Sequence, residues 1–202
     1  ESIESLSKVY GFSIIEDASH AIGGKYIDKP VGSCSYSDIT VFSFHPVKII
    51  TTAEGGMATT NNQDLAQKMR DLRSHGITKE FARFSEPTDH APWHYEQQSL
   101  GFNYRLNDIQ AALGISQLER LDEFVAKRNK IYKLYQHLLA DLPVKLLEIP
   151  ENVYSALHLA VIRLQDQTPE FHRALFETFK RARVGVQLHY MPVHTQPYYR
   201  NL

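Results

Sequence analysis

The sequence feature that most constrains the fold is a short apolar run that ends abruptly at a proline and is followed by a single lysine. The run covers Ile39–Phe44 and is rich in β-branched and aromatic residues, which predicts a buried strand. His45-Pro46 ends the run, because proline cannot continue a ladder of backbone hydrogen bonds. Lys48 then stands between Val47 and the pair Ile49-Ile50, so the end of this strand places an amine in apolar surroundings.

Two interpretations of Lys48 follow from these surroundings. Apolar neighbours weaken the solvation of the ammonium and favour the neutral amine, which is a usable nucleophile. Alternatively, the aliphatic stem of the lysine covers apolar surface while its charged head reaches water. The stretch by itself leaves both interpretations open.

A second stretch supplies the remaining groups of a candidate site. Phe12–Ile15 predicts another short buried strand, which runs into Asp17 and His20. Acids and histidines at the carboxyl end of such a strand lie where open α/β sheets bind ligands, although Asp17 could also be a helix N-cap or an ordinary loop carboxylate. Together with Lys48 and the hydroxyl of Ser43, these residues match what a pyridoxal phosphate site requires: a Schiff-base lysine, an acid for the pyridine nitrogen and phosphate donors.

Composition narrows the classes of function. The chain has 202 residues, a net charge of −1 and 43% hydrophobic residues, which predicts a soluble globular protein of one or two domains. The near-neutral charge gives no electrostatic basis for binding nucleic acid or an anionic membrane, and no apolar run approaches the roughly 20 residues that span a bilayer. With no signal peptide at its start and one cysteine, Cys34, in a polar turn, the sequence predicts a cytoplasmic protein without disulfides.

Periodicity and turn residues predict the order of the elements. Helices are expected over 1–10, 62–74, 107–139 and 168–183, further strands over 57–60, 157–164 and 184–188, and a long loop over 75–99 whose role, like that of His75, is undetermined. Gly11 should end the first helix, so the sequence opens inside a helix and resembles the middle of a domain. Pro143 and Pro150 predict a boundary between a domain over 1–140 and a smaller α+β unit over 141–202.

The motifs of the chain, in their order, resemble the DegT/DnrJ/EryC1/StrS family of nucleotide-sugar aminotransferases. They cover nearly the whole sequence: Asp17-x-x-His20, Ser43-x-x-x-x-Lys48, Glu54-Gly55-Gly56, Gly101-Phe102-Asn103-Tyr104-Arg105 with Gln110-Ala111-Ala112, and His189-Tyr190-x-Pro192-x-His194. Segments 43–48 and 73–76 are most similar to the branch that makes a UDP-linked 4-amino-4,6-dideoxy sugar for pseudaminic acid. One departure is Ala53, where the family commonly has glycine, and it leaves the conformation of that turn open.

The resemblance implies an α/β fold, the type I fold of pyridoxal phosphate-dependent transferases, present in part. Residues 1–140 would supply the second half of the large domain and residues 141–202 part of the small domain. Lys48 would hold the cofactor and move a proton between substrate and cofactor, while Asp17 would pair with the pyridine nitrogen. His20 would lie near the ring and its phenolic oxygen, or be a structural histidine, and Ser43 would donate to the phosphate.

The resemblance also implies partners. Asn103 would reach the phosphate of a neighbouring subunit's active site, which implies a homodimer with shared sites. Arg105 could bind an anionic substrate group or form a structural ion pair. His189 and His194 would lie on the substrate side; a metal site is not expected there, because Pro192 separates them, their spacing does not suit one helix face, and no cluster of carboxylates adjoins.

The implied function is pyridoxal phosphate-dependent transfer of an amino group from glutamate to a UDP-linked 4-keto-6-deoxy sugar. Lys48 argues against the dehydratases of the family, which have histidine in place of the lysine. Two alternatives are an aminotransferase for another nucleotide-linked keto sugar and a non-catalytic fragment or pseudoenzyme. The second arises because the family's phosphate-binding loop and ring-stacking aromatic are not among these residues, so we expect the isolated chain to be inactive.

Overall fold

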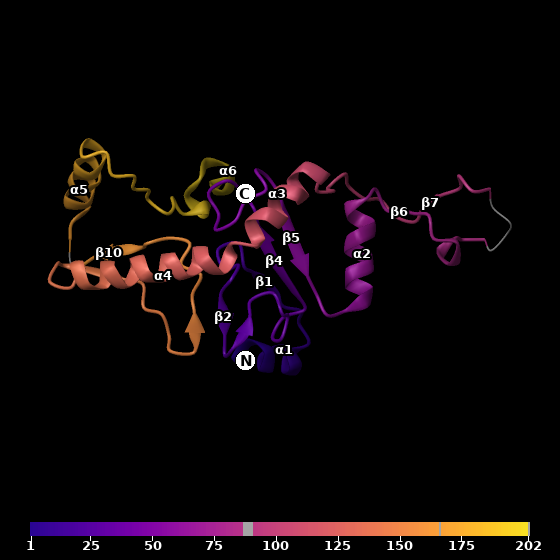
Figure 1. The fold of residues 1–202 in the computed structure, drawn as a ribbon, viewed down its shortest axis with the longest axis horizontal. Helices are drawn as coiled ribbons and strands as arrows, with labels where there is room; N and C mark the ends of the chain where they lie inside the picture. Colours follow the sequence, from indigo (N-terminus) through magenta and orange to yellow (C-terminus); the bar gives the residue numbers. More distant parts are fainter. Residues whose placement is uncertain (87–90, 166, 202) are drawn as a thin grey trace. The chain divides into compact units, whose positions relative to one another are not determined.

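The chain forms two compact units. A computed structural model describes residues 1–86, 91–165 and 167–201. The first unit contains residues 1–138 and 148–160, and the second contains residues 139–147 and 161–202 (Figure 1). Across these described ranges, no helix combines the length and the apolar character needed to cross a bilayer.

A three-stranded mixed sheet lies at the centre of the first unit (Figure 1). Strand β4 (Ile39–Ser43) runs between β1 (Ile15–Asp17) and β5 (Gly56–Thr59). Strands β1 and β4 are parallel, with Asp17 opposite Val41, whereas β4 and β5 are antiparallel. Because parallel strands end at the same edge of a sheet, the carboxyl ends of β1 and β4 place Asp17 and Ser43 at one edge.

The strand predicted over Phe12–Ile15 is wrong in both position and burial. Strand β1 begins at Ile15, all three of its residues are exposed, and Ile15 retains 68% of its accessible surface. The reason is that β1 is an edge strand whose partner within the described residues is β4, so its apolar side chain is not enclosed. By contrast, the prediction over Ile39–Phe44 is confirmed up to Ser43, with Phe42 and Phe44 both buried.

Three of the predicted helices are confirmed because local signals define their ends. Helix α1 (Ser2–Tyr10) stops at Gly11, which adopts the left-handed conformation with φ 71°. Helix α2 (Gln63–Arg73) begins after Asn62, whose side chain accepts a hydrogen bond from the Leu65 amide. In the second unit, helix α5 (Pro169–Arg181) begins after the N-cap Thr168, as the Thr-Pro pair predicts.

The helical stretch predicted over 107–139 is confirmed, but the chain divides it into two helices. The predicted capping box of Asn107 and Gln110 starts α3 (Asp108–Leu118), and α4 (Leu121–Leu138) follows after a break. Tertiary packing explains the break: Gly114 of α3 lies against Thr52, whereas Val125 of α4 packs with Ile49 and Ala156.

The predicted loop over 75–99 contains regular structure. Strands β6 (Ile77–Thr78) and β7 (Glu96–Gln97) form an antiparallel pair, and a 3₁₀ turn, η1, covers Phe81–Arg83. This segment extends from the end of α2 away from the central sheet (Figure 1). Residues 87–90 of the predicted loop lie outside the described residues.

The remaining strands are short. In the first unit, β2 (Lys25–Tyr26) pairs with β3 (Lys29–Pro30) and with β9 (Val153–Tyr154). In the second unit, β8 (Val144–Leu146) pairs with β10 (Ile162–Leu164), and the chain ends in η2 (Val193–Thr195) and α6 (Pro197–Arg200).

Two strand predictions in this part of the chain are corrected by the structure. The strand expected over 157–164 shortens to β10, because Leu157 has a positive φ of 50° that no extended strand adopts. The strand expected over 184–188 is wrong, since these described residues pair with no strand. Val184 and Leu188 there are about half exposed, so the apolar spacing did not reflect burial.

The core of the first unit joins the sheet to α4. One buried cluster consists of Ala18, Phe42, Phe44 and Ile50, and a second consists of Ile49, Val125 and Ala156. Ile22 and Leu121 pack against both clusters and so join them. Helix α4 thereby supports the turn after β1, the turn after β4 and the segment before residue 158.

Candidate active site

Lys48 lies in a tight turn directly after β4. Its backbone amide donates to the carbonyl of His45 at 2.9 Å, and the side chain of Lys48 is half-buried. Ile49 and Ile50, at 5% and 3% exposure, anchor the turn in the core on its other side. The amine is therefore attached to a rigid part of the fold at the edge where β1 and β4 end.

Asp17 provides a carboxylate at the same edge. Its Oδ1 accepts hydrogen bonds from the Ser19 hydroxyl at 2.5 Å and from the Ser19 amide at 3.0 Å. These two bonds are the main reason that the pKa of Asp17 is lowered, and the positive charges of His20 and Lys48 lower it further. Asp17 closes a turn and starts no helix, so its alternative role as an N-cap does not apply.

Lys48 and His20 lie near enough to Asp17 for their charges to lower its pKa, so three of the predicted site residues share this edge of the sheet. A carboxylate with a lowered pKa stays ionised near neutral pH, and an ionised partner is what a protonated pyridine nitrogen requires. Burial opposes the shift only in part, since the Asp17 side chain is exposed. The ionised Asp17 can serve as the partner of a cationic ring nitrogen at the edge of the sheet that also carries the Lys48 amine.

Ser43 ends β4 with a half-buried side chain. Its Oγ accepts a long hydrogen bond, 3.5 Å, from the amide of His45. The hydroxyl uses a lone pair in this contact, so its hydrogen is suited to donate to an anionic oxygen.

The turn that contains Glu54-Gly55-Gly56 closes against the end of β4. The amide of Phe44 donates to the carbonyl of Gly55 at 2.9 Å, and the Thr51 hydroxyl donates to the carbonyl of Phe44 at 3.1 Å. Ala53 adopts the left-handed conformation with φ 65°. Glycine suits that conformation better, but the alanine does not prevent the turn from forming.

Asn103 lies in a segment whose backbone is fastened to the end of α2. Ser74 and Asn103 form an isolated antiparallel bridge, and the amide of His75 donates to the carbonyl of Phe102 at 2.8 Å. The rings of Phe102 and Tyr104 stack 4.8 Å apart. Asn103 and Arg105 are both exposed, so their roles toward a cofactor or a substrate stay predictions.

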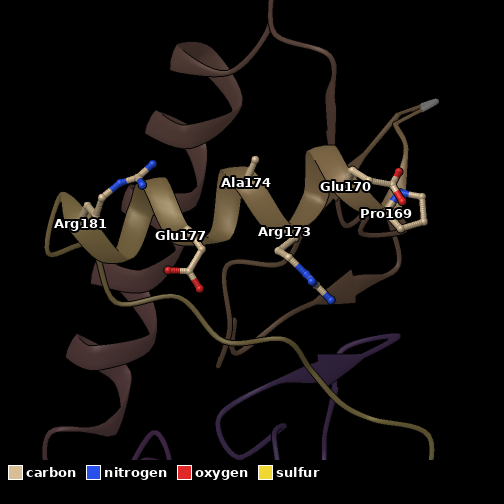
Figure 2. A pocket seen from close by; sticks show the side chains of 6 residues that line it. All are labelled: Pro169, Glu170, Arg173, Ala174, Glu177 and Arg181. Carbon is tan, nitrogen blue, oxygen red and sulfur yellow. The ribbon is translucent and has the colours of Figure 1, made fainter.

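His189 and His194 lie in the second unit, and their substrate role also stays a prediction. His194 is part of η2, while the His189 ring contacts that of Tyr190 at 3.7 Å. Within residues 1–86, 91–165 and 167–201, no group of three His, Cys, Asp or Glu side chains is placed to hold a metal ion. A pocket of this unit lies along α5 and includes neither histidine; its lining is Pro169, Glu170, Arg173, Ala174, Glu177 and Arg181 (Figure 2).

Sequence reasoning missed His158, whose ring lies 4.3 Å from that of His20 at an interplanar angle of 52°. Arg128 donates to the backbone carbonyls of Leu157 at 3.2 Å and His158 at 3.0 Å. The alternating charges of residues 119–128 predict a solvated helix face, and for Arg128 this prediction is wrong. The sequence does mark His158 as a candidate for a special role, because it is the one polar residue in the apolar stretch 156–161.

Comparison with known proteins gives a consistent result. The model of the DegT/DnrJ/EryC1/StrS aminotransferase family matches residues 1–202. A UDP-4-amino-4,6-dideoxy-N-acetyl-beta-L-altrosamine transaminase of Campylobacter jejuni is 40% identical, over 100% of this chain and 51% of that protein.

Solved structures agree with the family match. An aminotransferase of Helicobacter pylori involved in the biosynthesis of pseudoaminic acid superimposes with a TM-score of 0.87 at 34% identity, over 100% of this chain and 51% of that one. A putative sugar aminotransferase of Streptococcus pneumoniae, in its pyridoxal phosphate form, gives a TM-score of 0.82 at 28% identity, over 97% and 48%.

The chain thus spans about half the length of the relatives that it matches. These likenesses confirm the predicted fold class, an α/β aminotransferase fold matched over about half of its length. The family match covers every residue of the chain, and the Campylobacter relative exceeds a third in identity. The chain belongs to the DegT/DnrJ/EryC1/StrS aminotransferase family.

Proposed function

We propose that this chain supplies the lysine-bearing half of a pyridoxal phosphate-dependent enzyme, which transfers an amino group from glutamate to a UDP-linked 4-keto-6-deoxy sugar. The observation that supports this most strongly is that the ends of two parallel strands bring Asp17 and His20, after β1, and Lys48, after β4, to one edge of the sheet, where the pKa of Asp17 is lowered. The substrate class rests on the Campylobacter relative, whose name specifies a UDP-linked amino sugar.

The donor set fits the cofactor. Lys48 offers an amine on a turn anchored by two buried isoleucines, and Asp17 offers a carboxylate whose pKa is lowered by Ser19. Ser43 offers a hydroxyl at the same edge of the sheet. A covalent amine, an anion for a ring nitrogen and a phosphate donor are three groups that pyridoxal phosphate needs from a protein.

Each residue then has one task. When bound, pyridoxal phosphate supplies an electron sink that stabilises negative charge on the substrate carbon. The ionised Asp17 keeps the proton on the pyridine nitrogen, because loss of that proton would leave the carboxylate without a cationic partner. When free, the Lys48 amine would take the proton from the substrate carbon that bears nitrogen and give it to the cofactor, as a general acid and base. Ser43 binds the phosphate and fixes the ring between the other two groups.

We propose further that the working enzyme is a homodimer with shared sites, in which Asn103 reaches the phosphate bound by a second subunit. The exposure of Asn103, on a backbone that is fixed by the end of α2, supports this role.

One alternative is a non-catalytic fragment or pseudoenzyme that keeps ligand affinity without turnover. An aminotransferase for a different nucleotide-linked keto sugar is the other. Lys48 continues to argue against a dehydratase.

Amino transfer by the intact gene product tests the proposal. With glutamate, pyridoxal phosphate and a UDP-linked 4-keto-6-deoxy sugar, we expect 2-oxoglutarate and the 4-amino sugar in equal amounts. Lys48→Ala should abolish the reaction, whereas Asp17→Asn should retain some cofactor and lose most turnover. His137→Asn, an exposed position near the end of α4, is the control. Turnover that survives Lys48→Ala would overturn the proposal, and cofactor binding without turnover would support the non-catalytic alternative.

A further inference from the structure

The segment that carries His158 is fixed more tightly than an ordinary connection. Arg128 donates to two successive carbonyls, those of Leu157 and His158, at 3.2 and 3.0 Å. Asn129, the next residue of α4, donates through Nδ2 to the carbonyl of Ser155 at 2.9 Å. Ala156, between these attachments, is buried against Val125, so α4 holds the segment through both polar and apolar contacts.

Leu157 adopts an unfavourable backbone conformation within this segment. Its φ is 50°, and its side chain is 7% exposed. The left-handed region is unfavourable for a non-glycine residue, and such a residue persists only when the surrounding structure fixes it. The amide of Leu157 also donates to the Ser155 hydroxyl at 3.2 Å, which adds to that constraint.

His20 needs such a support. Its turn is fixed by backbone bonds, since Ala21 donates to the carbonyl of Ala18 at 2.9 Å, but the residue is exposed and its ring is not enclosed by the core. The His158 ring, 4.3 Å away and tilted by 52°, provides a wall on one side of it. The charge of His20 acts on Asp17, so the place of this ring matters to the site.

We infer that His158 is a positioning residue: it holds the His20 ring in place beside Asp17 and the cofactor, and α4 holds His158 through Arg128. The inference rests on the proposed function, because it assigns the His20 ring a place against pyridoxal phosphate. If the His20 ring is held in place before pyridoxal phosphate binds, no rotamer freedom of this side chain is lost on binding, and the affinity for the cofactor is higher.

The contact itself can be tested without cofactor. In the intact gene product with ¹³C-labelled histidine, His158→Leu should move the Cε1–H resonance of His20, because the neighbouring ring current is lost. The control His137→Asn should leave that resonance in place. An unchanged His20 resonance in a folded His158→Leu protein would overturn the inference.

Cofactor binding distinguishes positioning from general stabilisation. The dissociation constant for pyridoxal phosphate should rise about 2- to 12-fold in His158→Leu, which corresponds to the loss of one ring–ring contact. In a His20→Ala background the same substitution should have no further effect, since His158 acts through His20. His158→Phe keeps a ring and should recover part of the affinity.

The outcomes separate the inference from the proposed function. If the unaltered intact gene product binds no pyridoxal phosphate at Lys48, both fail. If it binds the cofactor and His158→Leu weakens binding equally with and without His20, the inference alone fails, because His158 would then have a merely structural role. Should His158→Leu not fold, the same cycle with His158→Phe decides the question.

Discussion

Single residues around the candidate site adopt backbone conformations that most side chains avoid. Ala53, His75 and Leu157 have φ angles of 65°, 63° and 50°. Each lies close in sequence or pairing to a site residue: Ala53 follows the Lys48 turn, His75 pairs with the segment of Asn103, and Leu157 precedes His158. Left-handed residues cost about 1–2 kcal/mol each, so the fold keeps them where they define the course of the backbone.

Ala53→Gly should stabilise the protein, because glycine adopts the left-handed conformation without steric cost. Glycine also raises the conformational entropy of the unfolded chain, which offsets part of this stabilisation. We therefore expect an increase of about 0.5–1 kcal/mol in the free energy of unfolding. Urea denaturation measures the difference. Ala126→Gly, at an exposed position inside α4, should instead destabilise by about 1 kcal/mol. Equal losses in the two variants would contradict the left-handed turn at Ala53.

Between elements, α3 approaches the Lys48 side of the sheet closely. A Cβ atom at Gly114 would lie 2.9 Å from Cγ2 of Thr52, which is 1% exposed. This contact joins the helix that follows Asn103 to the turn that follows Lys48. The absence of a side chain at Gly114 therefore sets the distance between two parts of the candidate site.

Gly114→Val should separate α3 from this turn. Overpacking against the buried Thr52 should cost about 1–3 kcal/mol, even though valine favours a helix over glycine. Ala112→Val, in the same helix but exposed, should cost less than about 0.5 kcal/mol. Thermal unfolding compares the two, and a Gly114→Val protein as stable as the Ala112→Val control would show that the close approach does not exist.

The segment between β6 and β7 is fastened to α2 by an ion pair. Arg83 of η1 pairs with Asp71 of α2, and Gln67 donates to Asp71 at 2.9 Å. The hydrogen bond from Arg83 is the main reason that the pKa of Asp71 is lowered, and the same pair raises the pKa of Arg83. Glu96 accepts from the amide and hydroxyl of Ser85 at 2.7 and 3.0 Å, which joins the two arms of the segment.

The lowered pKa of Asp71 predicts a dependence on pH. A carboxyl that binds protons more weakly when folded stabilises the fold above its ordinary pKa of about 4, and this contribution is lost as pH falls through the lowered value. Asp71→Asn should therefore destabilise by about 1–2 kcal/mol at pH 7 and by progressively less below pH 4. Unfolding experiments from pH 7 to pH 2 measure the difference.

Glu123→Gln is the matched control for this prediction, because it removes the exposed pair with Lys127 on α4. An exposed pair of this kind contributes little to stability, because solvent screens it. A difference between the wild-type and Asp71→Asn proteins that stays constant down to pH 2 would contradict the role of the charge.

The sequence predicted those elements whose ends have local causes. Asn62, Thr168 and Gly11 fix helix ends within one turn, so α1, α2 and α5 could be placed. The break between α3 and α4 could not, because it depends on packing against Thr52 and Ile49, more than 50 residues earlier. The exposure of β1 likewise depends on its place at a sheet edge rather than on Ile15 itself.

The residues of the candidate site also divide into those that the local sequence predicts and those whose place depends on distant contacts. Asp17, Ser43 and Lys48 could be proposed together because strand ends of a parallel pair share an edge. His158 stands out in the sequence as a polar residue in an apolar stretch, but its place beside His20 could not be predicted, because it depends on hydrogen bonds from Arg128, 30 residues earlier.

For the molecule as a whole, large apolar side chains remain exposed around Asn103. Leu100 and Ile109 keep 88% and 84% of their accessible surface, and Tyr104 keeps 74%. Exposed apolar side chains that gather along one segment are typical of surfaces that contact another protein. They agree with the proposed homodimer, in which Asn103 enters a second subunit's site.

Mixed dimers test the sharing of sites. In the intact gene product, Lys48→Ala and Asn103→Ala should each be nearly inactive alone. A heterodimer of the two would contain one site with both defects and one with neither, so co-refolding should restore activity to at most one site per dimer. If heterodimers form and no activity returns, Asn103 acts within its own subunit or not at all.

The account depends above all on Lys48 as the residue that bonds the cofactor, and reductive trapping tests this most directly. Pyridoxal phosphate is added to the protein, borohydride fixes the bond, and peptide mapping by mass spectrometry locates the modified lysine. We expect the modification on Lys48, reduced strongly in Asp17→Asn and unchanged in His137→Asn. A modification on another lysine, or none on the intact gene product, would contradict the account.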